Sequence, residues 1–126
     1  MMRHAGVVLL VLTLASCGTT SASRQVVSSD VLTRAEIQAS RAPNAYELLQ
    51  QLRPQFLRSR GALNVSDAAA GYAVVYVNDV HHGDLDSLRA IRIGEIEEIR
   101  YIGATDATTR WGTGHTGGVI QVRVRY

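Results

Sequence analysis

The 126-residue sequence has a single cysteine, only two prolines, few aromatic residues and no lysine. Because Cys17 has no partner in the chain, a fold held together by internal disulfides is excluded. Only one long apolar run occurs, from Ala5 to Leu14, and it is shorter than the roughly 20 apolar residues that span a bilayer. The basic residues, all arginine, number 13 against 11 acidic residues and are scattered. This argues against a nucleic-acid partner, because phosphate binding needs clustered positive charge.

Residues 1–16 have the three parts of a secretory signal peptide. Arg3 gives a basic start, the apolar run follows, and the small residues Ala15 and Ser16 come last. We therefore expect the chain to be exported and this segment to be removed.

The end of this segment, Leu14-Ala15-Ser16-Cys17, resembles the lipobox of bacterial lipoproteins. In that family the cysteine thiol receives a diacylglycerol and becomes the new N-terminus, so the resemblance implies lipidation of Cys17 and a membrane as partner. Gly18 resembles the residue found in lipoproteins that are sent to the outer membrane. The alternative interpretation is an ordinary signal peptide followed by an incidental cysteine.

Residues 17–29 are rich in Gly, Ser, Thr and Ala, a composition that buries too little apolar surface to fold. We expect a lipidated flexible tether there. The remaining residues, 30–126, have the length of one small domain.

Two helices are predicted at the start of this domain. Thr33 followed by Glu36 forms a capping box for a helix that begins at Arg34. The second helix is predicted from a cap and an apolar face and should end before Pro54; its signals are the cap residues Asn44 and Glu47 and the apolar residues Ala45, Leu48, Leu49, Leu52 and Phe56.

The rest of the domain predicts strands separated by turns. Tyr72–Val77 is expected to be a buried strand followed by a turn at Asn78-Asp79. A helical turn with Leu85 and Leu88 is expected next, followed by an acidic helical turn at Glu95 to Glu98 and then a strand. Asp106 is expected to cap a further turn that stops at Gly112. The last element is a half-buried strand at Val119 to Tyr126. This order predicts an α+β fold with a small mixed sheet and short helices.

From about residue 26 onward the sequence resembles the plug domain of TonB-dependent outer-membrane receptors. Three segments carry most of the resemblance, namely Val75-Tyr76-Val77-Asn78-Asp79-Val80, the isoleucine-rich acidic segment from Ile93 to Ile102, and Trp111-Gly112 with Gly117-Gly118-Val119-Ile120. Val31 to Leu52 is similar to the helical opening of the plug. The resemblance implies structural roles for the plug-motif residues Tyr76, Asp79, Ile96, Ile99, Trp111, Gly112, Gly117 and Gly118.

The sequence departs from this family in ways that affect function. Receptors of the family continue into a large β-barrel, whereas this sequence stops at Tyr126, and no energy-coupling box is recognisable in the tether. Asn78-Asp79 replaces the usual aspartate-glycine, and His115 replaces a small or basic residue. Transport therefore does not carry over to this chain alone.

Three other motifs have weaker chemical interpretations. The glycines at 112, 114 and 117 match a dinucleotide-binding fingerprint, but a strand rather than a helix is predicted to follow them. His81 and His82 are weak candidates for metal ligands, because adjacent residues of a strand point to opposite faces. The acidic residues Glu95, Glu97 and Glu98 are interpreted as a solvated face.

These observations predict a non-enzymatic, lipid-anchored envelope protein without a cofactor. It would bind another envelope protein, such as an outer-membrane barrel, or a small ligand, and would face the periplasm or the cell surface. The alternative is a structural remnant, or an accessory plug that acts in trans with an outer-membrane transport receptor.

Overall fold

The computed structural model describes residues 28–60 and 68–126, which contain one mixed β-sheet. The predicted signal peptide, Cys17 and most of the predicted tether lie outside the described residues. The strand order is β1-β4-β5-β2-β3, in which β2 and β5 run parallel and the other neighbours antiparallel. The strands are β1 (Val31–Leu32), β2 (Val74–Val77), β3 (Val80–Gly83), β4 (Ile96–Ile102) and β5 (Val119–Val124).

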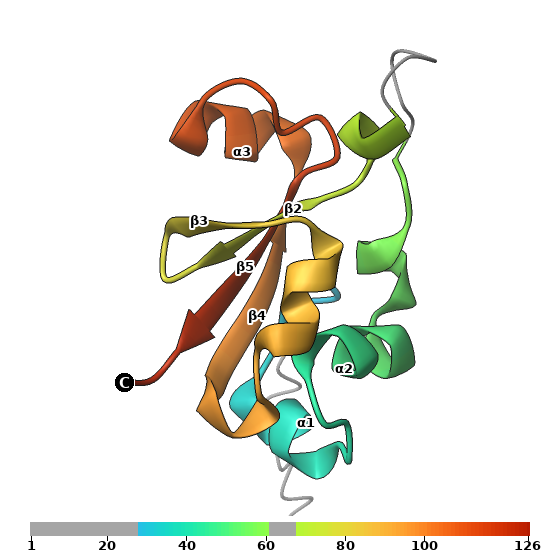
Figure 1. Cartoon of the computed structure of the whole chain (residues 1–126), viewed down its shortest axis with the longest axis vertical. Helices are drawn as coiled ribbons and strands as arrows, with labels where there is room; N and C mark the ends of the chain where they lie inside the picture. Colours follow the sequence, from blue (N-terminus) through green and yellow to red (C-terminus); the bar gives the residue numbers. More distant parts are fainter. Residues whose placement is uncertain (1–27, 61–67) are drawn as a thin grey trace, which may run out of the picture.

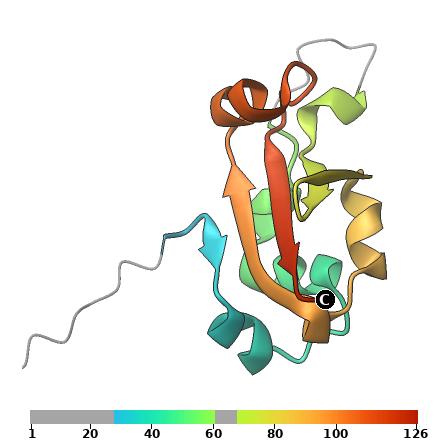
Figure 2. The same cartoon turned by 90° about the vertical axis from the view of Figure 1, so that its left-hand side faces the viewer.

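Short helices pack on both faces of the sheet (Figures 1 and 2). One face is covered by α1 (Arg34–Ala39), α2 (Ala45–Leu52) and the 3₁₀ helices η1 (Pro54–Leu57) and η3 (Leu85–Ala90), and the other by α3 (Ala104–Trp111). Two further 3₁₀ turns are η2 (Ala68–Gly71) and η4 (Ile93–Glu95). The predicted α+β class is confirmed. In the described part of the chain, no helix is long and apolar enough to cross a membrane.

The predicted caps of both N-terminal helices are confirmed. The Thr33 hydroxyl accepts from the Glu36 backbone N–H, and the Glu36 carboxylate accepts in return from the Thr33 N–H, so α1 begins at Arg34. The Asn44 side chain accepts from the Glu47 N–H at 3.0 Å and starts α2. This helix ends at Leu52, two residues before Pro54, as predicted.

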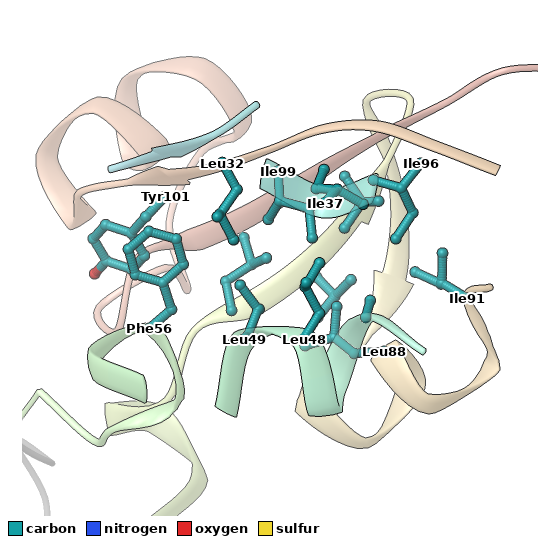
Figure 3. Close-up of a cluster of buried hydrophobic side chains, with 14 of the residues drawn as sticks. Leu32, Ile37, Leu48, Leu49, Phe56, Leu88, Ile91, Ile96, Ile99 and Tyr101 are labelled. Carbon is teal, nitrogen blue, oxygen red and sulfur yellow. The ribbon is translucent and has the colours of Figure 1, made fainter. Parts of the chain in front are cut away.

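The main hydrophobic core lies between the sheet and the helices α1 and α2 (Figure 3). Its side chains come from the sheet and from the helices that cover this face. Burial of each large apolar side chain stabilises the fold by about 1.5–3 kcal/mol. The largest fully buried members are Leu32, Ile37, Leu48, Leu49, Phe56, Leu88, Ile96, Ile99, Ile120, Val75 and Val122.

A second, smaller cluster lies on the opposite face, under α3, and the sequence did not predict it. Tyr76 and Val119 from the sheet pack there against Ala107 of α3. Because α3 crosses the start of β5, this strand is buried on both faces there, and even Gln121 is only 8% exposed. The predicted C-terminal strand is confirmed as β5, but its half-burial and its end were wrong, since Val119–Gln121 is buried on both faces and Tyr126 follows the strand and is fully exposed.

A β-bulge replaces the helical turn that was predicted at Glu95–Glu98. The 3₁₀ turn η4 ends at Glu95, and β4 already begins at Ile96. The pairing of β4 with β5 shifts between Ile96 and Glu98. A bulge adds one residue to a strand, so Ile96 and Ile99 both face the main core although they are three positions apart. The separation of three positions between Ile96 and Ile99 thus reflects a bulge and not a helix.

The cap of α3 also differs from the prediction. Gly103 precedes the helix without a side-chain cap, because β4 extends to Ile102 and the chain turns at once. Asp106 lies inside the first turn, where its negative charge interacts favourably with the helix dipole and so stabilises the helix. The predicted stop at Gly112 is confirmed, with a φ of +89° that suits glycine.

Candidate functional site

The plug-motif residues separate onto the two faces of the sheet. Ile96 and Ile99 lie in the main core beneath α1 and α2, where Figure 3 shows their side chains beside Leu32 and Ile37. The others lie at the opposite face or at the turns that border it. The structure therefore does not bring all of these residues together into one site.

Tyr76, Trp111 and His115 form an aromatic cluster at the end of α3. The Tyr76 and Trp111 rings pack with their centroids 4.6 Å apart. His115 is 6% exposed, and its Nε2 lies 3.0 Å from the Tyr76 hydroxyl. Its Nδ1 lies 2.8 Å from the Gly112 carbonyl oxygen, which can only accept, so Nδ1 carries a proton. In the neutral ring, Nε2 then accepts from Tyr76.

The role of His115 was not predicted from the sequence, where this residue was noted only as a departure from the plug-domain pattern. The structure uses both ring nitrogens to fix the loop between α3 and β5 on the sheet. The available signal was the combination of Tyr76 in a buried strand with a loop histidine close to Trp111, but sequence separation concealed their contact.

Asp79 closes the turn between β2 and β3. Asn78 and Asp79 have φ values of +47° and +67°, which these two residue types tolerate better than most, so the predicted turn is confirmed. The Asp79 carboxylate accepts from Gln121 at 2.7 Å and from Arg110 at 2.8 Å. Asp79 thus links the turn to β5 and α3.

Gly117 and Gly118 let the loop pass close to two other segments. A Cβ atom at Gly117 would overlap the Tyr72 carbonyl oxygen, and one at Gly118 would overlap the Tyr101 hydroxyl. Tyr101 donates to the Gly117 carbonyl at 2.8 Å. Burial raises the pKa of Tyr101, with Arg60 opposing and Asp30 adding to the rise, so the hydroxyl stays protonated and able to donate.

The two weak metal candidates lie on an edge strand. His81 and His82 are both exposed on β3, and the His81 ring packs edge-on against Tyr76 at 5.5 Å. Across residues 28–60 and 68–126, no three His, Cys, Asp or Glu side chains gather as a metal site would require. The structure therefore gives these histidines a surface position beside the aromatic cluster.

The acidic residues of β4 face arginines. Glu97 pairs with Arg125 at 2.6 Å, and Glu98 pairs with Arg100 at 3.1 Å. Glu95 is exposed at the end of η4. The first pair links β4 to the residue after β5, whereas the second lies within β4, and each contributes about 1 kcal/mol or less.

An open groove of about 760 Å³ lies where the α2–η1 side of the fold meets β3 and η3. Apolar and aromatic side chains form most of its wall, together with two carboxylates; it is lined in part by Tyr46, Leu57, Tyr72, His81, Asp84 and Leu85. Tyr72 is 43% exposed. Concave apolar surfaces with a few polar groups are the usual form of ligand sites, and sequence reasoning missed this one because its residues are distant in the chain.

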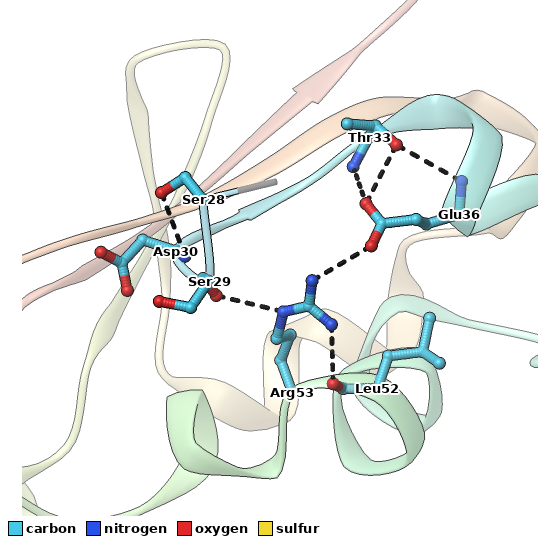
Figure 4. Close-up of polar contacts among 7 residues, drawn as sticks. All are labelled: Ser28, Ser29, Asp30, Thr33, Glu36, Leu52 and Arg53. Atoms are coloured by element: carbon cyan, nitrogen blue, oxygen red, sulfur yellow. Dashed lines mark hydrogen bonds and ion pairs between the residues drawn. The ribbon is translucent and has the colours of Figure 1, made fainter. Parts of the chain in front are cut away.

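A clasp around Arg53 holds the first described residues to the domain. The Arg53 guanidinium donates to the Ser29 carbonyl at 3.1 Å, to the Leu52 carbonyl at 2.9 Å and to the Glu36 carboxylate at 3.1 Å (Figure 4). The Thr33 backbone N–H lowers the pKa of Glu36 most strongly, and the Thr33 hydroxyl and Arg53 lower it further, against the effect of burial. The clasp therefore needs an ionised Glu36.

Replacing Glu36 with glutamine should destabilise the domain at neutral pH but not in acid. A carboxylate whose pKa is lowered by folding contributes stability above its unfolded value of about 4.3, and this is lost as pH falls through the folded pKa. We expect a loss of about 1 kcal/mol at about pH 7, measured by urea unfolding, that shrinks as the pH falls below the unfolded pKa of about 4.3.

Glu47→Gln is the matched control, because Glu47 also lies in the first turn of a helix. Its carboxylate makes no hydrogen bond or ion pair with any residue that the structure describes. A pH-independent loss in Glu36→Gln, or an equal loss in Glu47→Gln, would contradict the clasp.

A scan against family models, a search of curated proteins and a search of solved structures each found no match to this chain.

Proposed function

We propose that this protein is a lipid-anchored envelope protein whose α+β domain is a non-enzymatic binding module. The lipobox-like sequence ending at Cys17 supports the anchor. The plug-like motifs support a relationship to outer-membrane receptors, and thus an outer-membrane location facing the periplasm or the cell surface. The open groove beside Tyr72 is the observation that carries the binding role.

The composition of the groove suggests how it binds. Tyr46 and Tyr72 offer large apolar surfaces with polar tips, a combination that is enriched at binding interfaces. The Arg89 guanidinium lies 3.8 Å from the centre of the Tyr46 ring and also pairs with Asp86, which keeps that tyrosine in place. A partner would be a small amphipathic ligand or an apolar segment of another envelope protein.

Binding at the groove can be tested with a photo-crosslinking amino acid. Placed at Tyr72, it should capture a partner when native envelopes are irradiated. Placed at Tyr126, which is also exposed but does not line the groove, it should not. Equal capture at both positions, or none at Tyr72, would count against the groove as a binding site.

The anchor gives a separate prediction. Cys17→Ser should abolish lipidation, because the lipid is attached to the cysteine thiol. The protein should then move from the membrane fraction to the soluble fraction, because it loses the acyl chains that would hold a small domain at the membrane. Mass spectrometry of the mature N-terminus and fractionation would measure this. Ser23→Ala, in the predicted tether, should change neither result, and an unmodified Cys17 in the wild type would exclude the anchor.

A structural remnant or accessory plug acting in trans is the second candidate. It is favoured by the internal use of the plug-motif residues, since Ile96 and Ile99 fill the core and Gly117 and Gly118 allow close packing. Capture of an outer-membrane barrel at Tyr72 would support action in trans, whereas a stable domain with no partner would support the remnant.

A further inference from the structure

The start of β2 lacks a neighbouring strand on the side where β3 ends. Gly83, the last residue of β3, lies opposite Val75. The chain then enters η3 instead of continuing along β2 (Figure 1). Ala73, two positions before Val75, therefore has no strand partner on this side among the described residues.

The backbone of Ala73 points toward this open side. The Val74 N–H donates to the Gly118 carbonyl at 3.1 Å, and the Asn78 N–H donates to the Val122 carbonyl at 3.0 Å, so every second residue between them directs its backbone toward β5. Because backbone groups alternate in direction along a strand, the N–H and C=O of Ala73 point away from β5. Neither group is hydrogen-bonded to a residue that the structure describes, although Ala73 is only 3% exposed. Such groups are normally paired, so this edge suits a ligand that offers both an acceptor and a donor.

The groove beside Tyr72 runs along this edge. Ala73 lines it together with Tyr72 and Val74, while Gly83 and Leu85 contribute from the side where β3 ends. A strand placed beside Ala73 would direct alternate side chains to opposite faces. The apolar wall of the groove would therefore receive apolar side chains at every second position of such a strand.

The charge of the groove specifies a further feature of its partner. Two carboxylates line the groove, and no arginine is among its described lining residues. Asp86 pairs with Arg89 at 3.5 Å, which compensates its charge. The exposed Asp84 accepts from the Asp86 backbone N–H and forms no ion pair with any residue that the structure describes. One uncompensated negative charge remains, and it favours a partner with a basic side chain.

We propose that the groove binds an extended peptide segment of another protein, which pairs with Ala73 as an added strand. Apolar side chains at alternate positions of the segment enter the groove, and one basic side chain faces Asp84. In recognition of this kind the main chain supplies affinity, and the pockets for alternate side chains supply specificity. The inference rests on the proposed binding function and selects a protein segment over a small amphipathic ligand.

The test selects binders from random peptides of about nine residues displayed on phage. The bait is the chain without its predicted signal peptide, residues 17–126, with Cys17→Ser so that lipidation has no influence. We expect the selected peptides to share apolar residues at alternate positions and one lysine or arginine. Selection of no peptide, or of peptides without this alternation, would overturn the proposal.

N-methylation of a selected peptide tests the pairing directly. The N–H groups of a strand alternate between its two sides, so methyl groups on one set of alternate residues should weaken binding by on the order of tenfold or more. Methyl groups on the other set should have little effect. The Ala73 amide hydrogen should also exchange more slowly with solvent in the complex. Equal effects of both sets, or an unchanged exchange rate at Ala73, would overturn strand addition.

Asp84→Asn tests the role of charge. Asparagine can still cap η3, because its side-chain oxygen accepts a hydrogen bond as the carboxylate does. Binding of the basic peptide should weaken about threefold, as for an exposed ion pair, whereas a peptide with norleucine at the basic position should bind the variant and the parent equally. Asp106→Asn is the matched control, since it removes the same charge from an exposed position outside the groove. Equal weakening in both variants would overturn the role of Asp84.

The outcomes separate this inference from the proposed function. Capture of a partner at Tyr72 in native envelopes, together with failed peptide selection, would keep the groove as a binding site and overturn the peptide assignment. Peptide binding without capture at Tyr72 would contradict the envelope partner and leave strand addition supported. A concentration-dependent dimer in analytical ultracentrifugation that the selected peptide dissociates would identify a second copy of this chain as the occupant and overturn the assignment to another protein.

Discussion

Replacing Gly117 with alanine should cost about 3 kcal/mol of folding free energy or more. The added Cβ would overlap the Tyr72 carbonyl carbon and oxygen and would lie 2.7 Å from the Gly71 oxygen. All of these are backbone atoms, so no side chain can rotate away, and the segment before β2 must move. Overpacking of this kind typically costs about 1–3 kcal/mol and sometimes more.

The cost should be large because the two glycines join β2 to β5. The Val74 N–H donates to the Gly118 carbonyl at 3.1 Å, and the Gly118 N–H donates to the His115 carbonyl at 2.9 Å. Tyr101 reaches the same loop through its bond to the Gly117 carbonyl. Displacing Gly117 would therefore strain the parallel pairing of β2 with β5 and the loop that His115 fixes.

Gly94→Ala is the matched control for this prediction. A Cβ there meets nothing within 4 Å, and its φ lies outside the left-handed region. Urea unfolding should therefore give a change within about 0.5 kcal/mol for Gly94→Ala. If Gly117→Ala were equally mild, the close approach of the loop to Tyr72 would be contradicted.

The N-terminal helices were predictable because their signals are local. Thr33 with Glu36 and Asn44 with Glu47 each lie three positions apart, and a helix cap is completed within such a distance. Pro54 likewise acts on its immediate neighbours. The turn at Asn78 and Asp79 was predictable for the same reason, since few other residue types accept a positive φ.

The features that the sequence did not reveal depend on contacts between distant segments. The strand β1 has only two residues and exists because β4 offers it an edge. Gln121 is buried because α3 covers its face and Asp79 satisfies its amide. A local sequence pattern shows neither the bulge at Ile96 nor the helix that covers the second face of β5. The bulge was therefore predicted as a helical turn, and β5 was predicted to be half-buried.

The candidate sites show the same division. Individual residues such as Tyr76 and Gly117 were selected from motifs, but their partners, His115 and Tyr72, lie 39 and 45 positions away. The groove has no sequence signature, because it is assembled from several short segments. Motifs thus identified residues that the fold needs, whereas the candidate binding surfaces required the structure.

Ile99→Ala should have the other large effect, a loss of about 2–5 kcal/mol. Ile99 is completely buried at the centre of the sheet, where it lies opposite Leu32 on one side and Val122 on the other. Truncation leaves a cavity among strands that are paired on both sides and cannot easily close it. The free energy of unfolding of a domain is typically about 5–15 kcal/mol in total, so much of the stability would be lost.

A graded series distinguishes this core role from a role in binding. Ile99→Val removes one methylene and should cost about 0.5–1.5 kcal/mol, whereas Val80→Ala, at a side chain that is 68% exposed, should cost about 0.5 kcal/mol or less. If Ile99 serves only packing, Ile99→Val should still give the photo-crosslink at Tyr72. A cost for Ile99→Ala no greater than that for Val80→Ala would contradict the core, while loss of the crosslink in folded Ile99→Val would mean that this plug-motif isoleucine supports the groove directly.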